Sequence, residues 1–308
     1  MFRQNKRAYL MVALVAVLCW WFARSSHAQN QAGTSQRPLI LGVAHIAFQV
    51  SDLSKARAFY GELLGYDEPF QIRNEDNSLA LTYFKVNDRQ YIEIFPGLPP
   101  DKDDRLLHIA FETNDLEALR LYFQAKGVKA PDKVNQGRDG NINFTVTDPD
   151  NHRVEFVQYR PGSLHTRNKG RAMSTRRISE RILHVGLTVA DVPATDKFYK
   201  DVLGFSEIWR GGRDDATLNW INMRVPDGTD YLEYMLTTGK PTRQQLGSSH
   251  HAALLVPDMQ KALESLRERV PEPTQIRAPQ VGRNRRWQLN LFDQDGSRIE
   301  LMEPFPIR

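Results

Sequence analysis

The sequence contains a single cysteine among 308 residues, and that residue, Cys19, lies in an apolar run near the N-terminus. A chain processed after this run has no thiol, which excludes disulfides, thiolate metal ligands and a cysteine nucleophile. The sequence also lacks net charge beyond residue 28. The whole chain has 41 basic and 37 acidic residues, but four basic and no acidic residues fall in 1–28. The remainder is neutral, so the composition predicts no nucleic-acid partner.

Long hydrophobic runs are absent as well. The apolar run near the N-terminus, Leu10–Phe22, has 13 residues, whereas a helix needs about 20 to cross a bilayer. Basic residues precede this run, and Ser26-His27-Ala28 follows it with small residues at both key positions of a cleavage site. We therefore expect a signal peptide over residues 1–28 and a secreted or periplasmic protein without membrane contact after cleavage. The alternative is an anchor formed by the uncleaved N-terminal segment.

Two common catalytic patterns are also missing. Gly211-Gly212 is too short for a phosphate-cradling loop and is not followed by Lys-Ser or Lys-Thr. No serine lies in a nucleophile-elbow context, so a Ser-His-Asp triad is not supported.

The chain does contain a fourfold internal repeat. Each unit begins with a strand-like segment in which Asp follows His by seven residues, and a helix-like stretch comes next. The Asp is placed to cap the helix, and Gly65, Gly127 and Gly204 are placed to end three of the four helices. Each unit closes with a strand-like run that contains Glu. The four His-Glu pairs, separated by 47 to 49 residues, are His45 and Glu93, His108 and Glu155, His184 and Glu233, and His251 and Glu300.

The four units fall into two pairs. Units one and three share the pattern FY…LG, and units two and four share an Asp-rich turn before the last strand, at 148–150 and 293–296. The chain is therefore interpreted as a tandem duplication of a two-unit domain. We expect the first domain at 41–160, a polar, basic linker at 161–178 and the second domain at 180–305.

The His and Glu positions have the pattern of ligands. In each first strand the residues at odd offsets from His are almost wholly apolar, so His lies on the opposite face. That face carries a small residue two positions after His, which leaves space beside each imidazole. Each Glu is flanked by apolar residues and also lies on the face opposite to theirs. The small residues are Ala47, Ala110, Gly186 and Ala253.

A divalent cation explains four imidazoles and four carboxylates on inward faces, because an unpaired buried carboxylate is costly. For one isolated pair, a hydrogen bond between His and Glu without a metal is the preferred explanation, but four pairs in register favour the metal. Two units supply two His and two Glu, a set that suits Ni, Co, Mn, Fe or Zn better than Ca.

On these motifs the sequence resembles the vicinal oxygen chelate superfamily, which includes glyoxalases, bleomycin-resistance proteins and extradiol dioxygenases. The resemblance covers Leu41–Tyr159 and Ile182–Pro304. It implies an α+β fold of four βαβββ modules, forming two tandem domains with cupped mixed sheets. It also implies two metal sites built from the first-strand His and last-strand Glu residues, although some members pair modules across halves or subunits. The first site has His45, Glu93, His108 and Glu155, and the second has His184, Glu233, His251 and Glu300.

The resemblance implies a small-molecule substrate that binds the metal through adjacent oxygens, and three activities remain open. The first is a lyase or isomerase similar to glyoxalase I, in which a metal-bound Glu moves a proton. Glu155 and Glu300 are then the candidate catalytic bases, and Glu93 and Glu233 are their partners on the metal. Glutathione-dependent detoxification is mainly cytosolic, so export points to another substrate.

The second activity is an extradiol-type Fe(II) dioxygenase with the triad His184, His251 and Glu300. Four modules in one chain of this length match that layout. However, the residues before Glu300 lack the His and Tyr of the dioxygenase signature, and Glu233 is surplus to a triad. The third activity is small-molecule binding by a protein of the bleomycin-resistance type. Metal-free proteins of this type lack the metal-binding residues, so the presence of all eight in this sequence argues against the metal-free form.

The remaining polar residues carry less weight. Five arginines of the second half are placed to hold an anionic substrate or to form a solvated basic face, and the second interpretation is favoured. They are Arg210, Arg213, Arg283, Arg285 and Arg286. Four histidines outside the repeat position are interpreted as surface or incidental residues, and they are His27, His152, His165 and His250. The sequence does not indicate an oligomeric state.

Overall fold

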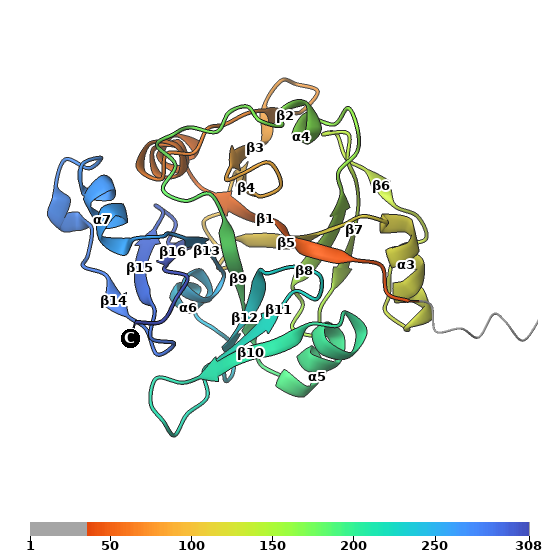
Figure 1. Ribbon diagram of the computed structural model, residues 1–308. Coiled ribbons are helices and arrows are strands. Elements are labelled where there is room, and N and C mark those ends of the chain that lie inside the picture. The colour runs from red at the N-terminus through yellow and green to blue at the C-terminus, as the bar shows by residue number, and fades with distance from the viewer. Residues whose placement is uncertain (1–35, 308) are drawn as a thin grey trace, which may run out of the picture. The chain divides into compact units, whose positions relative to one another are not determined.

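The computed structural model describes residues 36–307 (Figure 1). The expected signal peptide lies outside the described residues. Among residues 36–307, every helix is too short or too polar to cross a membrane.

The first half contains two βαβββ units. In each unit a long first strand leads into a helix and then into three further strands. The helix of the first unit begins as an α-helix and continues with π-helical geometry. The elements are β1 (Ile40–Val50), α2 (Leu53–Ala56), η2 (Arg57–Leu63), β2 (Gln71–Arg73), β3 (Leu79–Lys85) and β4 (Tyr91–Pro96), then β5 (Leu106–Thr113), α3 (Leu116–Ala125), β6 (Asn135–Gln136), β7 (Ile142–Thr147) and β8 (Arg153–Gln158).

The second half repeats this order after a connecting segment that contains the short helix α4 (Leu164–Arg167). It has the same π-helical continuation in its first unit and one extra helix, α6, before its second unit. Its elements are β9 (Ile182–Val189), α5 (Val192–Asp196), η3 (Lys197–Val202), β10 (Ser206–Gly211), β11 (Trp220–Arg224), β12 (Tyr231–Leu236) and α6 (Arg243–Ser249), then β13 (His251–Leu255), α7 (Met259–Arg267), η4 (Pro273–Gln275), β14 (Gln280–Val281), β15 (Trp287–Phe292) and β16 (Arg298–Met302).

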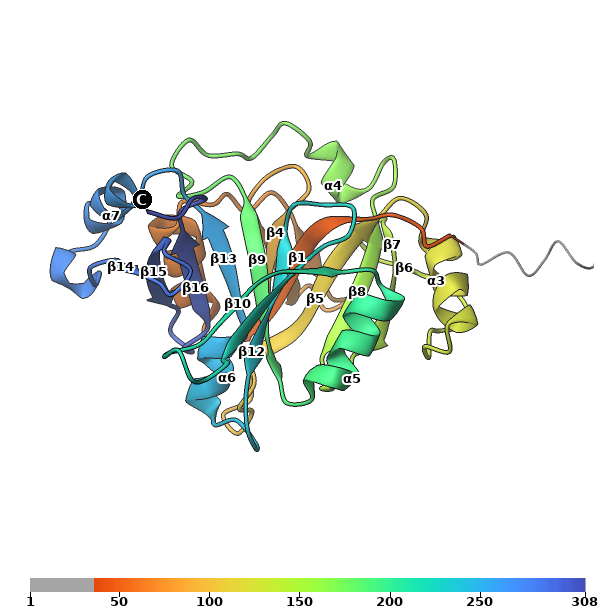
Figure 2. The same ribbon diagram turned by 60° about the horizontal axis from the view of Figure 1, so that its bottom comes forward.

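Each half forms one curled, eight-stranded mixed sheet (Figure 2). The strand orders are β2-β3-β4-β1-β5-β8-β7-β6 and β10-β11-β12-β9-β13-β16-β15-β14. The first strands of the two units pair antiparallel at the centre of each sheet, and each pairs in parallel with the last strand of its own unit. The predicted fold of paired βαβββ modules is confirmed, and the modules pair within halves.

The predicted helix signals act as expected. Asp52, Asp115, Asp191 and Asp258 each accept hydrogen bonds from backbone N–H groups in the first turn of the following helix. These bonds satisfy amides that have no partner inside the helix. Gly65, Gly127 and Gly204 follow the helix ends with φ angles of +79°, +76° and +81°, a left-handed conformation that glycine adopts without steric cost.

The two halves share one apolar core. A single cluster of buried side chains contains residues from both sheets and from the helices of both halves. Helix α3 of the first half lies beside the helix formed by α5 and η3 of the second (Figures 1 and 2). In this contact the rings of Phe123 and Phe198 are stacked with their centroids 6.3 Å apart. The Tyr122 hydroxyl donates to the Val202 carbonyl at 2.8 Å in the same contact. The helices of each half therefore pack against the other half.

The two shared sequence motifs contact each other across the halves. The Tyr60 hydroxyl, from FY…LG of unit one, donates to Asp293 Oδ2 in the Asp-rich turn of unit four at 3.0 Å. The Tyr199 hydroxyl of unit three donates to Asp148 Oδ2 of unit two, also at 3.0 Å. All four residues are buried, so these charge-assisted bonds tie the halves together where water is excluded.

Candidate metal centres

The first cup gathers the four predicted side chains of the first half. His45 and His108 lie on the central strands β1 and β5, and Glu93 and Glu155 lie on the adjacent strands β4 and β8. The two Nε2 atoms are 3.0 Å apart. Glu93 approaches both imidazoles at 3.5 Å, and Glu155 approaches them at 3.7 and 3.8 Å. One ligand atom from each of His45, His108 and Glu155 lies within 4.8 Å of the other two, so these three residues form a potential metal-binding group.

The second cup repeats this arrangement with His184 and His251 on β9 and β13, and Glu233 and Glu300 on β12 and β16. The two Nε2 atoms are again 3.0 Å apart. The four contacts between carboxylate and imidazole range from 3.4 to 3.8 Å. All four residues are buried and form one potential metal-binding group. The structure therefore brings together all eight side chains that the repeat singled out, in two sets of four.

The small residues after each His have a specific place in this arrangement. In the first sheet Ala47 lies opposite His108, and Ala110 lies opposite His45. In the second sheet Ala253 lies opposite His184, and Gly186 lies opposite His251. Each small residue therefore makes room for the imidazole of the partner unit rather than for its own.

The chemistry of the donor set fits a divalent metal. Two ligands at about 2.1 Å from a metal and at right angles to each other lie about 3.0 Å apart, which is the separation of the two Nε2 atoms in each cup. His251 Nδ1 donates to the Ser249 carbonyl at 2.8 Å, so that its Nε2 keeps the lone pair a metal requires. Each group can therefore hold a divalent ion. The sequence predicts that this ion is Ni, Co, Mn, Fe or Zn.

Burial shifts the pKa values of the first centre. It raises the pKa of Glu93 to about 8 and that of Glu155 to about 7, because a buried carboxylate loses its hydration. It also lowers the pKa of His45 well below 6.5. Without a metal, the first cup therefore favours neutral side chains, and a bound cation is needed to hold both carboxylates in the charged form.

The second centre differs because the positively charged guanidinium group of an arginine lies next to it. Arg298 Nη2 is 2.8 Å from Nδ1 and 2.9 Å from Nε2 of His251. Burial and this guanidinium lower the pKa of His251 to about 3. Burial also raises the pKa of Glu233. For Glu300 the effect of burial is outweighed by polar contacts with His184 and His251, at 3.5 and 3.4 Å, and by the positive charge of Arg298, which together lower its pKa. One carboxylate of this centre is therefore held charged.

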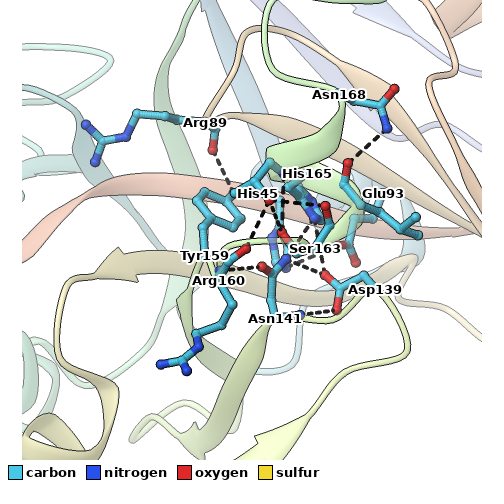
Figure 3. A network of polar contacts seen from close by, with 12 residues as sticks. His45, Arg89, Glu93, Asp139, Asn141, Tyr159, Arg160, Ser163, His165 and Asn168 are labelled. Carbon is cyan, nitrogen blue, oxygen red and sulfur yellow. Dashed lines mark hydrogen bonds and ion pairs between the residues drawn. The ribbon is translucent and has the colours of Figure 1, made fainter.

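The two centres also differ in the volume of the cavity next to them. The second cup opens into a cavity of about 670 Å³, and both Glu233 and Glu300 line it. Its walls include the side chains of Trp209, Trp220 and Arg213. The first cup leaves only about 150 Å³, because α4 of the connecting segment inserts His165 into it (Figure 3). Only the second centre has room for a substrate of ordinary metabolite size.

Three of the four histidines interpreted as surface or incidental residues are buried. His152, His165 and His250 are at most 8% exposed. His152 and His250 both contact the Thr188 hydroxyl through Nε2, at 3.1 and 3.0 Å, and reach aspartates through Nδ1. They belong to the contact between the halves and not to a metal centre. The other units have no histidine at these repeat positions, so the repeat gave no reason to group them. His27 lies outside the described residues.

The five arginines separate into two groups. Arg213 and Arg283 line the second cavity, and Arg283 also contacts Asp215. Arg210 pairs with Glu207 on the surface. Arg285 and Arg286 do not line the cavity. Sequence reasoning missed Arg298, which lies directly opposite His251 in the strand register. Its place two residues before Glu300, on the same face of the strand, was the available signal.

Comparisons with known proteins agree with this architecture. The model of the Glyoxalase/Bleomycin resistance protein/Dioxygenase superfamily matches residues 42–156 and 181–301. The chain therefore belongs to this superfamily, whose name covers two kinds of enzyme and one kind of resistance protein. The uncharacterized protein YaeR of Escherichia coli K12 is 28% identical over 123 residues, which are 38% of this chain and 95% of that protein.

Among solved structures, the chain is similar to ring-cleaving dioxygenases. Homoprotocatechuate 2,3-dioxygenase of Brevibacterium fuscum, in complex with 3,4-dihydroxyphenylacetate, is 21% identical with a TM-score of 0.62, covering 86% of this chain and 81% of that one. The 2,3-dioxygenase LapB of Pseudomonas sp. KL28 is 16% identical with a TM-score of 0.63, covering 88% and 96%. At these identities the likeness shows a common fold.

Proposed function

We propose that this protein is a metal-dependent lyase or isomerase that acts in the second cup. The substrate binds through two adjacent oxygens, and a carboxylate of the centre moves a proton next to a carbonyl group. The observation that carries this proposal is the open cavity of about 670 Å³ that is lined by Glu233 and Glu300, the two carboxylates of the second centre.

The number of ligands supports proton transfer over ring cleavage. If all four side chains held a six-coordinate ion, two positions would be left for a substrate that binds through two oxygens. An extradiol dioxygenase needs a third free position for dioxygen, and a triad of His184, His251 and Glu300 provides it only if Glu233 stays off the metal. Glu233 is buried and lies 3.5 Å from His251 Nε2, which favours its inclusion.

The residues that line the cavity suggest a separate role for each of the two carboxylates. A divalent ion held by this set supplies Lewis-acid stabilisation for negative charge that develops on the substrate oxygens. Glu300 and Glu233 both line the cavity, so either carboxylate can reach a substrate proton. We assign proton transfer to an Oε atom of Glu300 and retention of the ion to Glu233.

The charges of the cavity point to an anionic substrate. Arg213, Arg283 and Arg298 line it together with Trp209 and Trp220. A guanidinium binds a carboxylate through two parallel hydrogen bonds, and an indole ring packs against an aromatic or apolar group. A 2-oxo acid with an aromatic side chain combines these features with two adjacent oxygens.

Hydrogen exchange tests the proposal directly. We expect the metal-loaded protein in D₂O to speed deuterium incorporation next to the carbonyl of phenylpyruvate or pyruvate, measured by NMR against a protein-free blank. Glu300→Gln is expected to slow this exchange by at least about 100-fold, the scale of a lost general base. The matched first-cup variant Glu155→Gln is expected to leave it unchanged. Equal exchange rates in wild type and Glu300→Gln contradict the assignment.

Oxygen consumption distinguishes the second candidate. The likeness to dioxygenases makes 3,4-dihydroxyphenylacetate the appropriate probe. Protein loaded with Fe(II) that consumes oxygen with this catechol, and yields a ring-opened product, is a dioxygenase and not the proposed lyase or isomerase. An unchanged oxygen level together with exchange of the 2-oxo acid supports the first proposal.

Export is part of the proposal and has its own test. The thirteen-residue apolar run and the Ser26-His27-Ala28 site support removal of residues 1–28. N-terminal sequencing of the protein from an exported fraction is expected to begin at Gln29. A chain that begins at Met1 in the membrane fraction supports the uncleaved anchor instead.

A further inference from the structure

The connecting segment is built into the first cup through specific contacts. The Leu164 amide donates to the Asp139 carbonyl at 2.8 Å. Gly140 has a φ of +89°, and a Cβ there would lie 3.2 Å from Ser163 Cα, so the segment approaches closely at a residue without a side chain. Lys85, fully buried, donates to the carbonyls of Asn168 at 2.6 Å and Arg171 at 2.8 Å. Helix α4 is therefore held in place from both sides.

This fixed segment places His165 among aromatic rings in the first cup. Its ring centroid lies 4.6 to 5.2 Å from those of four aromatic side chains. His165 is 3% exposed and lines the same small cavity as His45 and Glu93. The four aromatic residues are Phe70, Tyr83, Tyr91 and Tyr159.

The hydrogen bonds of Asn141 determine which ring nitrogen of His165 carries the proton. Asn141 Oδ1 accepts from the Arg160 amide at 3.0 Å, and Asn141 Nδ2 donates to Asp139 Oδ2 at 2.6 Å. These two bonds fix the amide orientation, because a flipped amide would place its oxygen against the carboxylate. Asn141 Nδ2 then faces His165 Nδ1 at 2.8 Å and donates to it. Asp139 Oδ2 is more distant from that nitrogen, at 3.3 Å. In neutral His165, the proton therefore lies on Nε2.

Within residues 36–307 no group forms a hydrogen bond with this Nε2, although it is buried. A buried donor without an acceptor costs about 1–3 kcal/mol, so an acceptor in the adjoining cavity is required. The cavity of about 150 Å³ leaves no room for a substrate such as an aryl 2-oxo acid. Because its Nε2 carries a proton, neutral His165 is not a metal ligand.

We propose that the first cup holds a small oxygen ligand, water or hydroxide, between its His₂Glu₂ set and His165, with His165 Nε2 donating a hydrogen bond to that oxygen. The connecting segment thus closes the first centre as a structural metal site, while the second remains open to substrate. The proposal shares with the proposed function the premise that these donor sets bind metal, but it concerns the other cup and requires no catalytic activity.

The test uses Co²⁺ as the probe in the full processed chain, with His251→Ala present so that only the first centre is loaded. Three proteins are compared, with His, Phe or Gln at position 165. His165→Phe keeps a ring among the aromatic side chains but removes the N–H group. His165→Gln accepts from Asn141 and again presents an N–H to the cup. The readouts are the visible absorption spectrum of bound cobalt and the rate of its removal by EDTA, with thermal unfolding as the check on folding.

We expect His165→Phe to shift the cobalt spectrum and to speed EDTA removal about tenfold, the lower end of the effect of losing a group that supports a metal ligand. His165→Gln is expected to restore most of both properties. The same His165→Phe change in a His108→Ala background, where only the second centre is loaded, is expected to change neither. Identical spectra and rates for His and Phe overturn the proposal. A Gln variant that behaves like Phe overturns the donor role, and a first centre that binds no cobalt overturns the structural site.

Discussion

Gly186 lies directly opposite His251 across the antiparallel strands β9 and β13, and a Cβ at this glycine would collide with the imidazole ring. The absence of a side chain on one unit therefore lets the ligand of the other unit reach the second centre. In units one and two the small residues Ala47 and Ala110 lie opposite the imidazoles and leave space for them.

Gly186→Ala is expected to displace His251 and to weaken metal binding at the second centre by at least about tenfold, since ligand position is set within fractions of an ångström. Binding at the first centre serves as the internal control, because its ligands lie on the other sheet. Titration with Co²⁺ measures both affinities in one protein. Two unchanged affinities contradict the packing role assigned to this glycine.

Arg298 is expected to oppose metal binding at the second centre. Its guanidinium lies within 3 Å of both ring nitrogens of His251, and a cation next to a ligand disfavours a second cation. Arg298→Met is therefore expected to tighten Co²⁺ binding about tenfold and to weaken binding of an anionic 2-oxo acid, both measured by calorimetry. Arg153 occupies the equivalent place in unit two but is exposed, so Arg153→Met is the matched control. Weaker metal binding in Arg298→Met contradicts this role.

The stability of the metal-free protein is expected to fall as pH rises. Burial raises the pKa of Glu93 to about 8 and of Glu155 to about 7, so that the folded state holds protons which the unfolded state has already released. This contribution is complete below the ordinary carboxyl pKa and is lost as pH rises through the folded values. Burial lowers the pKa of His45, so this residue makes stability rise with pH, but only below about pH 6.5.

Thermal unfolding of EDTA-treated protein tests this expectation. The melting temperature is predicted to fall by a few degrees between about pH 6.5 and pH 9. Glu93→Gln, which does not ionise, is predicted to reduce the fall. Added metal is predicted to oppose it, because the ion stabilises both carboxylates in their charged form. A melting temperature that rises over this range contradicts the assigned pKa shifts.

The contacts between tyrosine and aspartate across the halves are expected to stabilise the fold without affecting the metal centres. Tyr199→Phe leaves the buried Asp148 with one hydrogen bond fewer and is expected to cost about 1–3 kcal/mol of unfolding free energy. Tyr60→Phe is expected to cost a similar amount through Asp293. Urea denaturation measures both, and metal content is expected to remain that of the wild type. Loss of metal without loss of stability in either variant contradicts this separation.

Much of the architecture was predictable because the repeat constrains it. Strand periodicity placed His and Glu on one face, and the four capping aspartates set the start of each helix. The outcome that depends on contacts between distant segments was not predictable. The insertion of His165 into the first cup has no counterpart in the second half, and the burial of His152 and His250 depends on how the halves pack. Local patterns carry no information about such contacts.

Substitution of one imidazole at a time, followed by elemental analysis, tests the central claim most directly. The account predicts two divalent ions per wild-type chain, and one ion in either His108→Ala or His251→Ala, with the fold retained by circular dichroism. Each variant is the control for the other, because the two residues lie at equivalent positions of different cups. Unchanged metal content in both variants would contradict the claim that these histidines form metal centres.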